Sequence, residues 1–160
     1  MNLEGLPERL RSELHGRKVV ILCLGSEIRG DDAAGLQVCD HLAKMGLSDL
    51  VIRAGLVPEA FLPELGKREA EVVLIVDAVD AGLPPGSVVL AEPPFQEGLT
   101  PISTHGLPLD LLASLFKEEL PNVRILLLGI QVAQTEVGSS ISRQVAHSVR
   151  LVADLINQAL

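Results

Sequence analysis

The residues of this sequence that could do chemistry are acidic side chains and one histidine that follow predicted strands. Asp31 and Asp32 come after the first apolar run, and Asp77 directly ends a second one. His105 lies in a polar turn before a predicted helix, whereas the other three histidines fall in the N-terminal segment or inside predicted helices. Ligands of open α/β sheets bind beyond the carboxyl ends of the strands. These positions therefore predict one shared site.

The side-chain types at Asp32, Asp77 and His105 suit a metal ion or acid–base chemistry. Two carboxylates and one imidazole form a mixed oxygen and nitrogen donor set that zinc, nickel or another borderline divalent ion accepts. Each residue also has a structural interpretation, because an aspartate can cap a helix and a loop histidine can simply face solvent. The pattern predicts a metal or acid site and leaves these alternatives open.

The glycines around the first acids do not form a phosphate-binding loop. Gly25, Gly30 and Gly35 recur at regular intervals, but no Lys-Ser or Lys-Thr pair follows them. Asp31 and Asp32 stand where a phosphate would need hydrogen-bond donors. We therefore exclude a phosphate-loop function for this segment.

Short apolar runs predict a parallel sheet. We expect strands at residues 19–25, 72–76 and 125–130, and shorter ones at 51–53 and 87–91. Unbroken apolar runs are typical of strands that are covered on both faces. The turn Pro84-Pro85-Gly86 precedes the strand at 87–91, which we place at an edge of the sheet.

Helical stripes of apolar residues separate the strands. They begin at Asp32, run from Leu109 until Pro121 stops them, and run from Val145 through the C-terminus. Pro58 opens a further short helix, whose regular part Pro63 limits. This alternation predicts an α/β fold: a three-layer α/β/α arrangement with a mostly parallel twisted sheet of about five strands and helices on both faces.

Length and composition predict one domain spanning residues 1–160. The chain is 48% hydrophobic with a formal net charge of −8, which disfavours a nucleic-acid partner. No apolar run reaches the roughly 18 residues of a membrane span, and residues 1–16 are unlike a signal peptide. We therefore expect a cytoplasmic protein. Cys23 and Cys39 lack a CxxC spacing, so we expect reduced, packed thiols.

Four segments in register resemble the hydrogenase maturation protease family over nearly the whole chain from residue 19 onward. The closest similarity is to the branch that serves hydrogenases of the formate-hydrogenlyase type. The segments are Leu24-Gly25-Ser26 with Gly30-Asp31-Asp32 and Gly35, Leu74-Ile75-Val76-Asp77-Ala78-Val79-Asp80, Ser103-Thr104-His105-Gly106-Leu107-Pro108-Leu109, and Leu128-Gly129-Ile130-Gln131.

The resemblance implies an endopeptidase that removes a short C-terminal extension from the nickel-loaded precursor of a nickel–iron hydrogenase large subunit. It implies that Asp32, Asp77 and His105 contact nickel, and that Asp32 and Asp77 are the catalytic residues of an aspartic-type peptidase. Nickel then belongs to the substrate as a recognition element, so we expect the isolated protein to bind it weakly or not at all. We expect a monomer whose partner is the large-subunit precursor, with no membrane insertion.

Three positions depart from the pattern of the family. Ser26 replaces an Asn, Arg53-Ala54-Gly55 replaces Asp-Gly-Gly, and Val132 replaces a common Pro. The last two bear on partner specificity, because none of the three positions expected to contact nickel is altered. Residues 1–17 form an N-terminal extension without a predicted role.

Two other functions fit parts of the pattern. A receiver-type signalling domain also has an acid pair and a strand-end aspartate, but it needs a lysine at the end of its last strand, where this chain has Gln131. A non-catalytic nickel- or peptide-binding protein fits as well, because no Ser/His or Cys/His nucleophile pair is evident.

Overall fold

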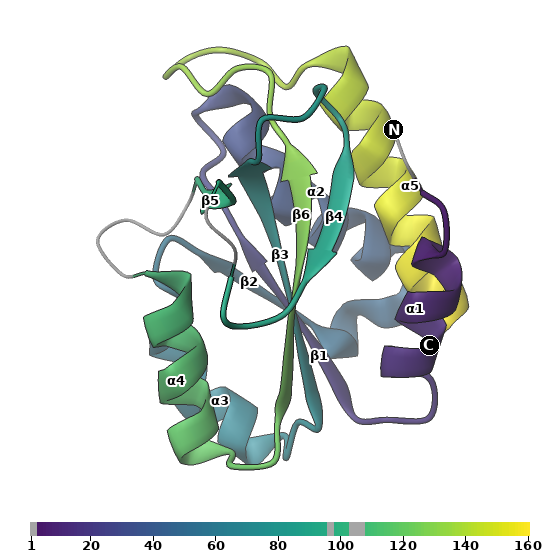
Figure 1. Cartoon of the computed structure of the whole chain (residues 1–160), viewed down its shortest axis with the longest axis vertical. Helices are drawn as coiled ribbons and strands as arrows, with labels where there is room; N and C mark the ends of the chain where they lie inside the picture. The colour runs from purple at the N-terminus through teal and green to yellow at the C-terminus, as the bar shows by residue number, and fades with distance from the viewer. Residues whose placement is uncertain (1–2, 96–97, 103–107) are drawn as a thin grey trace.

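The apolar runs of the sequence form the central sheet of the protein (Figure 1). The computed structural model describes residues 3–95, 98–102 and 108–160. Within them the sheet has six strands in the order β2-β1-β3-β6-β4, with β5 paired to β3 off this path. The strands are β1 (Val19–Leu24), β2 (Val51–Gly55), β3 (Val72–Asp80), β4 (Val88–Ala91), β5 (Thr100–Pro101) and β6 (Arg124–Gln131).

The sheet is mixed, and its central part is parallel as predicted. β3 pairs in parallel with β1 and β6, whereas β4 runs antiparallel to β6 at the end of the sheet. The edge position predicted for residues 87–91 is confirmed. The predicted number of about five strands was too low, because the two-residue β5 has no apolar run of its own and forms by pairing with Val79 and Asp80.

β3 is longer than the sequence predicted. The apolar run ends at Val76, but β6 continues to pair with β3 as far as Val79, opposite Gln131. Pairing with β6 and β5 therefore extends the strand beyond its apolar part. As a result Asp77 lies inside β3 rather than directly after it.

Helices cover both faces of the sheet, which confirms the three-layer prediction (Figure 1). One face carries α1, α2 and α5, and the other carries α3 and α4. The helices are α1 (Leu6–Leu14), α2 (Ala34–Leu42), α3 (Leu62–Lys67), α4 (Leu109–Glu119) and α5 (Arg143–Ala159), with the short turns η1 (Gly30–Ala33), η2 (Ala43–Leu47), η3 (Ser48–Leu50) and η4 (Pro58–Phe61). Among the described residues, none of these helices is long and apolar enough to cross a membrane.

The N-terminal extension is part of the folded domain. Leu6, Leu10 and Leu14 recur every four residues, so they share one face of α1, and all three are buried in the core beside α5. On another face of α1, Glu13 accepts two hydrogen bonds from Arg124 of β6, at 3.0 and 2.9 Å. Residues 6–14 thus have a structural role that the sequence had left unassigned.

The prediction of two reduced thiols was wrong, because Cys23 and Cys39 form a disulfide. Cys23 lies in β1 and Cys39 in α2, and packing of the helix on the strand brings their Cα atoms to 6.2 Å. This separation is within the range that a disulfide spans. The sequence spacing gave no signal of the pairing, since it depends on how α2 lies across β1.

Candidate active site at the carboxyl edge of the sheet

Asp32 is held in η1 by backbone hydrogen bonds from the loop that follows β1. The Ser26 N–H donates to the Asp32 carbonyl at 3.2 Å, and the Asp32 N–H donates to the Arg29 carbonyl at 3.1 Å. A Cβ atom at Gly25 would lie 2.2 Å from the Asp32 carbonyl oxygen, so only glycine fits there. The Asp32 side chain is fully buried.

Asp77 lies in β3 opposite Gly129 of β6 and is also fully buried. Ile75 and Val79, two residues before and after it, belong to the core under α4. Because strand side chains alternate between faces, Asp77 lies on the same face. The aspartate therefore interrupts an apolar row in the most protected strand of the sheet.

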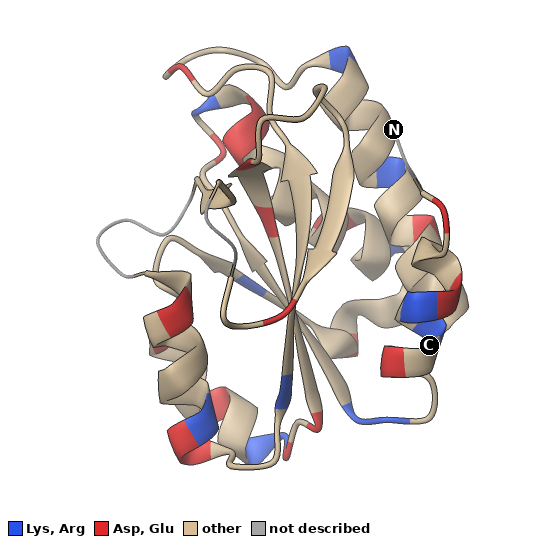
Figure 2. Ribbon diagram, viewed as in Figure 1, with Lys and Arg blue, Asp and Glu red and all other residues tan. Residues whose placement is uncertain are grey.

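The two buried aspartates come from elements that lie against each other. η1 contacts β3, and the first turn of α2 packs on the strand ends: a Cβ at Gly35 would lie 2.4 Å from the carbonyl oxygens of both Leu24 and Val76. Figure 2 shows the acidic segments of η1 and β3 near the upper end of the sheet. The structure thus places Asp32 and Asp77 at the same edge of the sheet, and their roles in a shared site stay a prediction.

His105 lies outside the described residues, because the structure does not describe residues 103–107. Over the ranges that it does describe, no group of three metal-binding side chains is found. The predicted set of Asp32, Asp77 and His105 is therefore not tested as a trio, and it stays a prediction. The described part of the following segment begins at Pro108, directly before α4.

Asp31 has a structural role that sequence reasoning missed. Its Oδ2 accepts hydrogen bonds from the backbone N–H groups of Ala133 and Gln134 at 2.8 and 3.1 Å, and from the Ser142 hydroxyl at 2.9 Å. Its Oδ1 accepts from the Ser142 N–H at 2.6 Å. The fully buried carboxylate thus ties η1 to the loop between β6 and α5. No sequence signal could have paired residues about a hundred positions apart.

Backbone hydrogen bonds fasten the same two loops along their length. The Gly30 N–H donates to the Ser139 carbonyl at 3.1 Å, and the Gly138 N–H donates to the Ile28 carbonyl at 2.8 Å. This contact brings together two exposed apolar side chains, since Ile28 is 64% and the neighbouring Val137 is 74% exposed. The loops beside the buried acids therefore carry two exposed apolar side chains.

Arg53, which stands at a position where the family usually has an acid, is neutralised by two acids. Its guanidinium donates to Asp40 Oδ1 at 3.1 Å and pairs with Glu27 of the loop after β1. The hydrogen bond to Asp40, with the further bond to Glu27, raises the pKa of Arg53, so it stays charged. The substitution therefore adds an ion-paired cation at the rim of the site rather than an isolated positive charge.

Asp80 ends β3 and accepts a hydrogen bond within the turn that follows. Its Oδ1 accepts from the Gly82 N–H and from the Gln131 side chain, each at 3.2 Å. These two hydrogen bonds hold the pKa of Asp80 below its ordinary value, and the side chain faces solvent. Gln131 is buried and its Oε1 also accepts from the Ala81 N–H at 2.7 Å, so it holds this turn in place.

Comparisons with known proteins identify the family. The profile of the hydrogenase maturation protease family matches residues 36–159, which include Asp77 and His105 and begin after Asp32. The hydrogenase 3 maturation protease of Escherichia coli K12 is 34% identical over 113 residues, 70% of this chain and 71% of that protein.

Two solved structures agree with this match. The crystal structure of the [NiFe] hydrogenase maturation protease HycI from Thermococcus kodakarensis superposes with a TM-score of 0.83 and 30% identity, over 95% of this chain and 98% of that one. The solution structure of the endopeptidase HycI from Escherichia coli superposes with a TM-score of 0.76 and 28% identity, over 87% of this chain and 89% of that one. The family predicted from the motifs is confirmed, and the receiver-type alternative is set aside: this chain belongs to the hydrogenase maturation protease family.

Proposed function

We propose that this protein is an endopeptidase that removes a short C-terminal extension from the nickel-loaded precursor of a nickel–iron hydrogenase large subunit. Membership of a family of maturation proteases supports the reaction class. The observation that carries the proposal is the burial of Asp32 and Asp77 at one edge of the sheet. Burying a carboxylate is costly for stability, so two such residues at one place favour a role in binding or catalysis.

Nickel carried by the precursor is the recognition element in this proposal. The carboxylates of Asp32 and Asp77, with the imidazole of His105, form a mixed donor set that suits a borderline ion such as nickel. A metal that arrives in the substrate, with some of its ligands supplied by the precursor, needs only a few more from the protease. Docking through that ion would place the scissile peptide bond beside the acids, and such positioning lowers a barrier by several kcal/mol.

The chain's own acids supply the proton transfers of an aspartic-type hydrolysis. A carboxylate at Asp32 or Asp77 accepts a proton from water as the water oxygen bonds to the peptide carbonyl carbon. The carbon–nitrogen bond then breaks, and the proton passes to the departing amine. Burial of both side chains keeps bulk water from competing at this step.

The exposed apolar side chains and the compartment also belong to the proposal. Ile28 and Val137 give the precursor an apolar surface next to the buried acids. We place the reaction in the cytoplasm. The protease acts there as a monomer on its precursor.

The test is processing of the nickel-loaded precursor by Asp77→Asn, which keeps the size of the side chain and removes its charge. We expect cleavage, followed by mass spectrometry of the large subunit, to slow by at least ~100-fold, the lower range for losing an acid–base group. Asp80→Asn is the matched control three residues further along β3, and we expect a much milder effect from it.

Two outcomes would contradict the proposal. Near-normal processing by Asp77→Asn, at matched stability, would reduce Asp77 to a structural residue. Isolation of the protein with one stoichiometric, chelator-resistant metal ion would favour an ordinary metallopeptidase over recognition of nickel in the substrate. Binding of the precursor without any loss of mass would instead favour the non-catalytic alternative.

A further inference from the structure

The edge strand β4 has a free side. It is the last strand of the sheet and pairs with β6 alone among the described strands. Gly86, at a φ of 87°, donates its N–H to the Gln131 carbonyl, and the Gln131 N–H donates to the Ser87 carbonyl. This glycine bulge fixes Ser87 as a residue bonded to β6, so by alternation the N–H and C=O groups of Val88 and Leu90 point away from the sheet.

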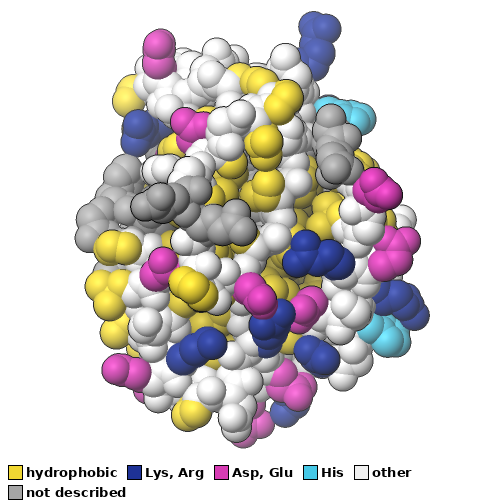
Figure 3. Space-filling model, viewed as in Figure 1, with side chains coloured by type: hydrophobic (Ala, Val, Ile, Leu, Met, Phe, Trp, Pro, Cys, Tyr) yellow, Lys and Arg dark blue, Asp and Glu magenta, His cyan; other side chains and the backbone are white. Residues whose placement is uncertain are grey.

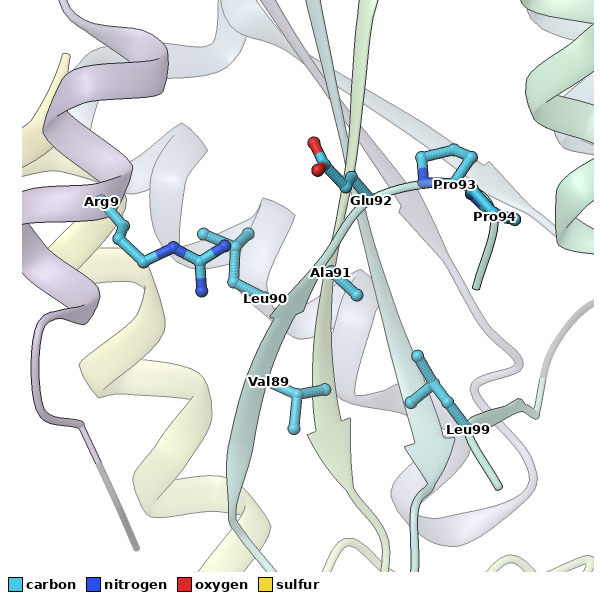
Figure 4. Close-up of a pocket in the computed structure, with 8 residues that line it drawn as sticks. All are labelled: Arg9, Val89, Leu90, Ala91, Glu92, Pro93, Pro94 and Leu99. Carbon is cyan, nitrogen blue, oxygen red and sulfur yellow. The ribbon is translucent and has the colours of Figure 1, made fainter. Parts of the chain in front are cut away.

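A cavity of about 590 Å³ runs along this free side, lined by residues 89–94 between Arg9 and Leu99 (Figure 4). Successive side chains of a strand point to opposite faces, yet Val89, Leu90 and Ala91 all line the cavity. It therefore lies on the edge of β4 rather than on one face of the sheet. Its volume is within the range of ligand-binding pockets, and we name it the β4 pocket.

The β4 pocket continues from the candidate active site. Asp77 pairs with Gly129, and Gly129 pairs with Val89, so the three residues form one row across β3, β6 and β4. With strands about 4.8 Å apart, Val89 lies roughly 10 Å from Asp77. An extended chain covers that distance in about three residues. Figure 3 shows apolar atoms at the surface over β4 and β6, along this path.

The lining of the β4 pocket includes one cation, Arg9, and one acid, Glu92. Figure 4 shows Arg9 beside Leu90, whereas Glu92 lies further along, beyond Ala91. Glu92 pairs with Arg124, whereas Arg9 is exposed and forms no ion pair with any residue in the described ranges. In a chain with a net charge of −8, this cation favours an acidic group on the occupant.

We propose that the β4 pocket binds the C-terminal extension of the precursor as an added β-strand, with the C-terminal carboxylate of that extension at Arg9. The inference rests on the proposed function, from which it takes the substrate. The outward N–H and C=O groups of Val88 and Leu90, which pair with no other described strand, supply the main-chain hydrogen bonds of strand addition. A chain that leaves the buried acids and ends at Arg9 runs parallel to β4, and its C-terminus is itself a carboxylate.

Proline scanning of the edge tests the strand pairing. The probe is a synthetic peptide with the sequence of the precursor's extension, labelled at its N-terminus, and binding to the full chain is followed by fluorescence anisotropy. Leu90→Pro removes an outward N–H and leaves the bonds to β6 intact, which an edge strand tolerates. We expect it to weaken binding by at least ~10-fold, the loss typical of a main-chain hydrogen bond with its neighbouring contacts. Leu90→Ala keeps the N–H and should weaken binding of the peptide less.

Arg9→Gln tests the role of the arginine charge. Arg9 is an exposed residue of α1, so this second variant leaves the strands of the sheet unchanged. We expect it to weaken binding of the peptide with a free C-terminal carboxylate by about tenfold, the range of a charge-assisted hydrogen bond. Binding of the C-terminally amidated peptide should be unaffected. Arg11→Gln, on the same helix but outside the β4 pocket, is the matched control for both peptides.

Several outcomes would overturn the inference. Leu90→Pro binding as well as Leu90→Ala would exclude strand addition, and equal losses for both peptides with Arg9→Gln would exclude the carboxylate. A parent chain that dimerises in sedimentation, becomes monomeric with Leu90→Pro and never binds the peptide would assign the edge to self-association. Failure of the proposed function looks different, because the parent chain would then leave the precursor uncleaved, or Asp77→Asn would process it normally, whatever the peptide does.

Discussion

At the scale of single residues, two neighbouring aspartates of this protein have different roles. Asp31 accepts four hydrogen bonds between 2.6 and 3.1 Å from the loop between β6 and α5, and every donor belongs to that loop. Asp32 lies one residue further in η1, at the edge that also holds Asp77. Asp31 therefore holds η1 in place, and η1 positions Asp32 at the edge of the sheet.

Asp31→Asn should destabilise the protein. An amide nitrogen in place of one carboxylate oxygen would face backbone N–H donors, and the remaining bonds would lose their charge. Bonds to a charged group contribute about 1.5–3 kcal/mol each, and an unsatisfied buried donor costs about as much, so we expect the free energy of unfolding to fall by roughly 3 kcal/mol. Urea denaturation measures it.

Asp154→Asn, at an exposed position of α5, is the control for this substitution and should change the free energy of unfolding little. If Asp31→Asn costs no more than this control, the hydrogen bonds to the loop do not hold η1.

At the scale of elements, close packing of α2 against the strand ends positions the site. Gly35 lets the first turn of α2 approach the carbonyl groups of Leu24 and Val76, and the disulfide between Cys23 and Cys39 joins the same helix to β1. β1 and α2 are the elements on either side of the loop that carries Asp31 and Asp32. The loop is thus closed covalently as well as by packing.

Reduction of the disulfide should lower stability. The linked residues are 16 positions apart, and a loop of about 15 residues gives roughly 3 kcal/mol in the chain-entropy estimate. We expect dithiothreitol to lower the free energy of unfolding by that order. The measurement is urea denaturation with and without reductant, together with thiol titration of the denatured chain before and after reduction.

Cys39→Ala provides the control, because its stability should not respond to reductant. Two titratable thiols in the denatured chain before reduction would show that the cysteines are unpaired and would contradict this prediction.

At the scale of the whole molecule, Arg124 connects the N-terminal helix to the sheet and its edge. It donates two hydrogen bonds to Glu13 of α1 and pairs with Glu92, which follows β4. The hydrogen bond from Arg124 is the main reason that the pKa of Glu13 lies below its ordinary value. The same guanidinium therefore anchors α1 and compensates the acid at the end of the β4 pocket.

The Glu13–Arg124 pair should make stability depend on pH. A carboxylate with a lowered pKa stabilises the fold above the ordinary value of 4.5, and this contribution is lost as the pH falls through the lowered pKa of the folded state. Glu13→Gln should cost about 1 kcal/mol at pH 7, the upper range for a partly exposed pair, and nothing at the acidic end. Urea denaturation from pH 7 to 3 measures the difference without screening it with salt.

Glu118→Gln on the exposed side of α4 should follow the parent protein at every pH. A difference between Glu13→Gln and the parent that persists unchanged into acid would assign the loss to packing of the side chain instead of its charge.

The sequence by itself determined the layers of this protein and the edge of the sheet at which Asp32 and Asp77 lie. Residues 19–24, 72–76 and 125–130 are apolar without interruption, and the stripes of α2, α4 and α5 recur with the helical period. Such patterns are local, because the spacing of the apolar residues decides between helix and strand. It does so regardless of which element covers the buried face. The aspartates at 32 and 77 come after two of those apolar runs, so their shared edge could be predicted, as could the family from its motifs.

The tertiary structure decided everything that depends on residues far apart in the chain. The bonds of Asp31 to Ser142, the disulfide of Cys23 with Cys39, and the extension of β3 by β6 and β5 each need a partner whose position only the fold sets. The free edge of β4 beside Arg9 is of the same kind, since it depends on which strand ends the sheet and on where α1 packs. The sequence specifies the type of each side chain. Hydrogen bonds, disulfides and pockets also require distances of a few ångströms between groups, and only packing creates these.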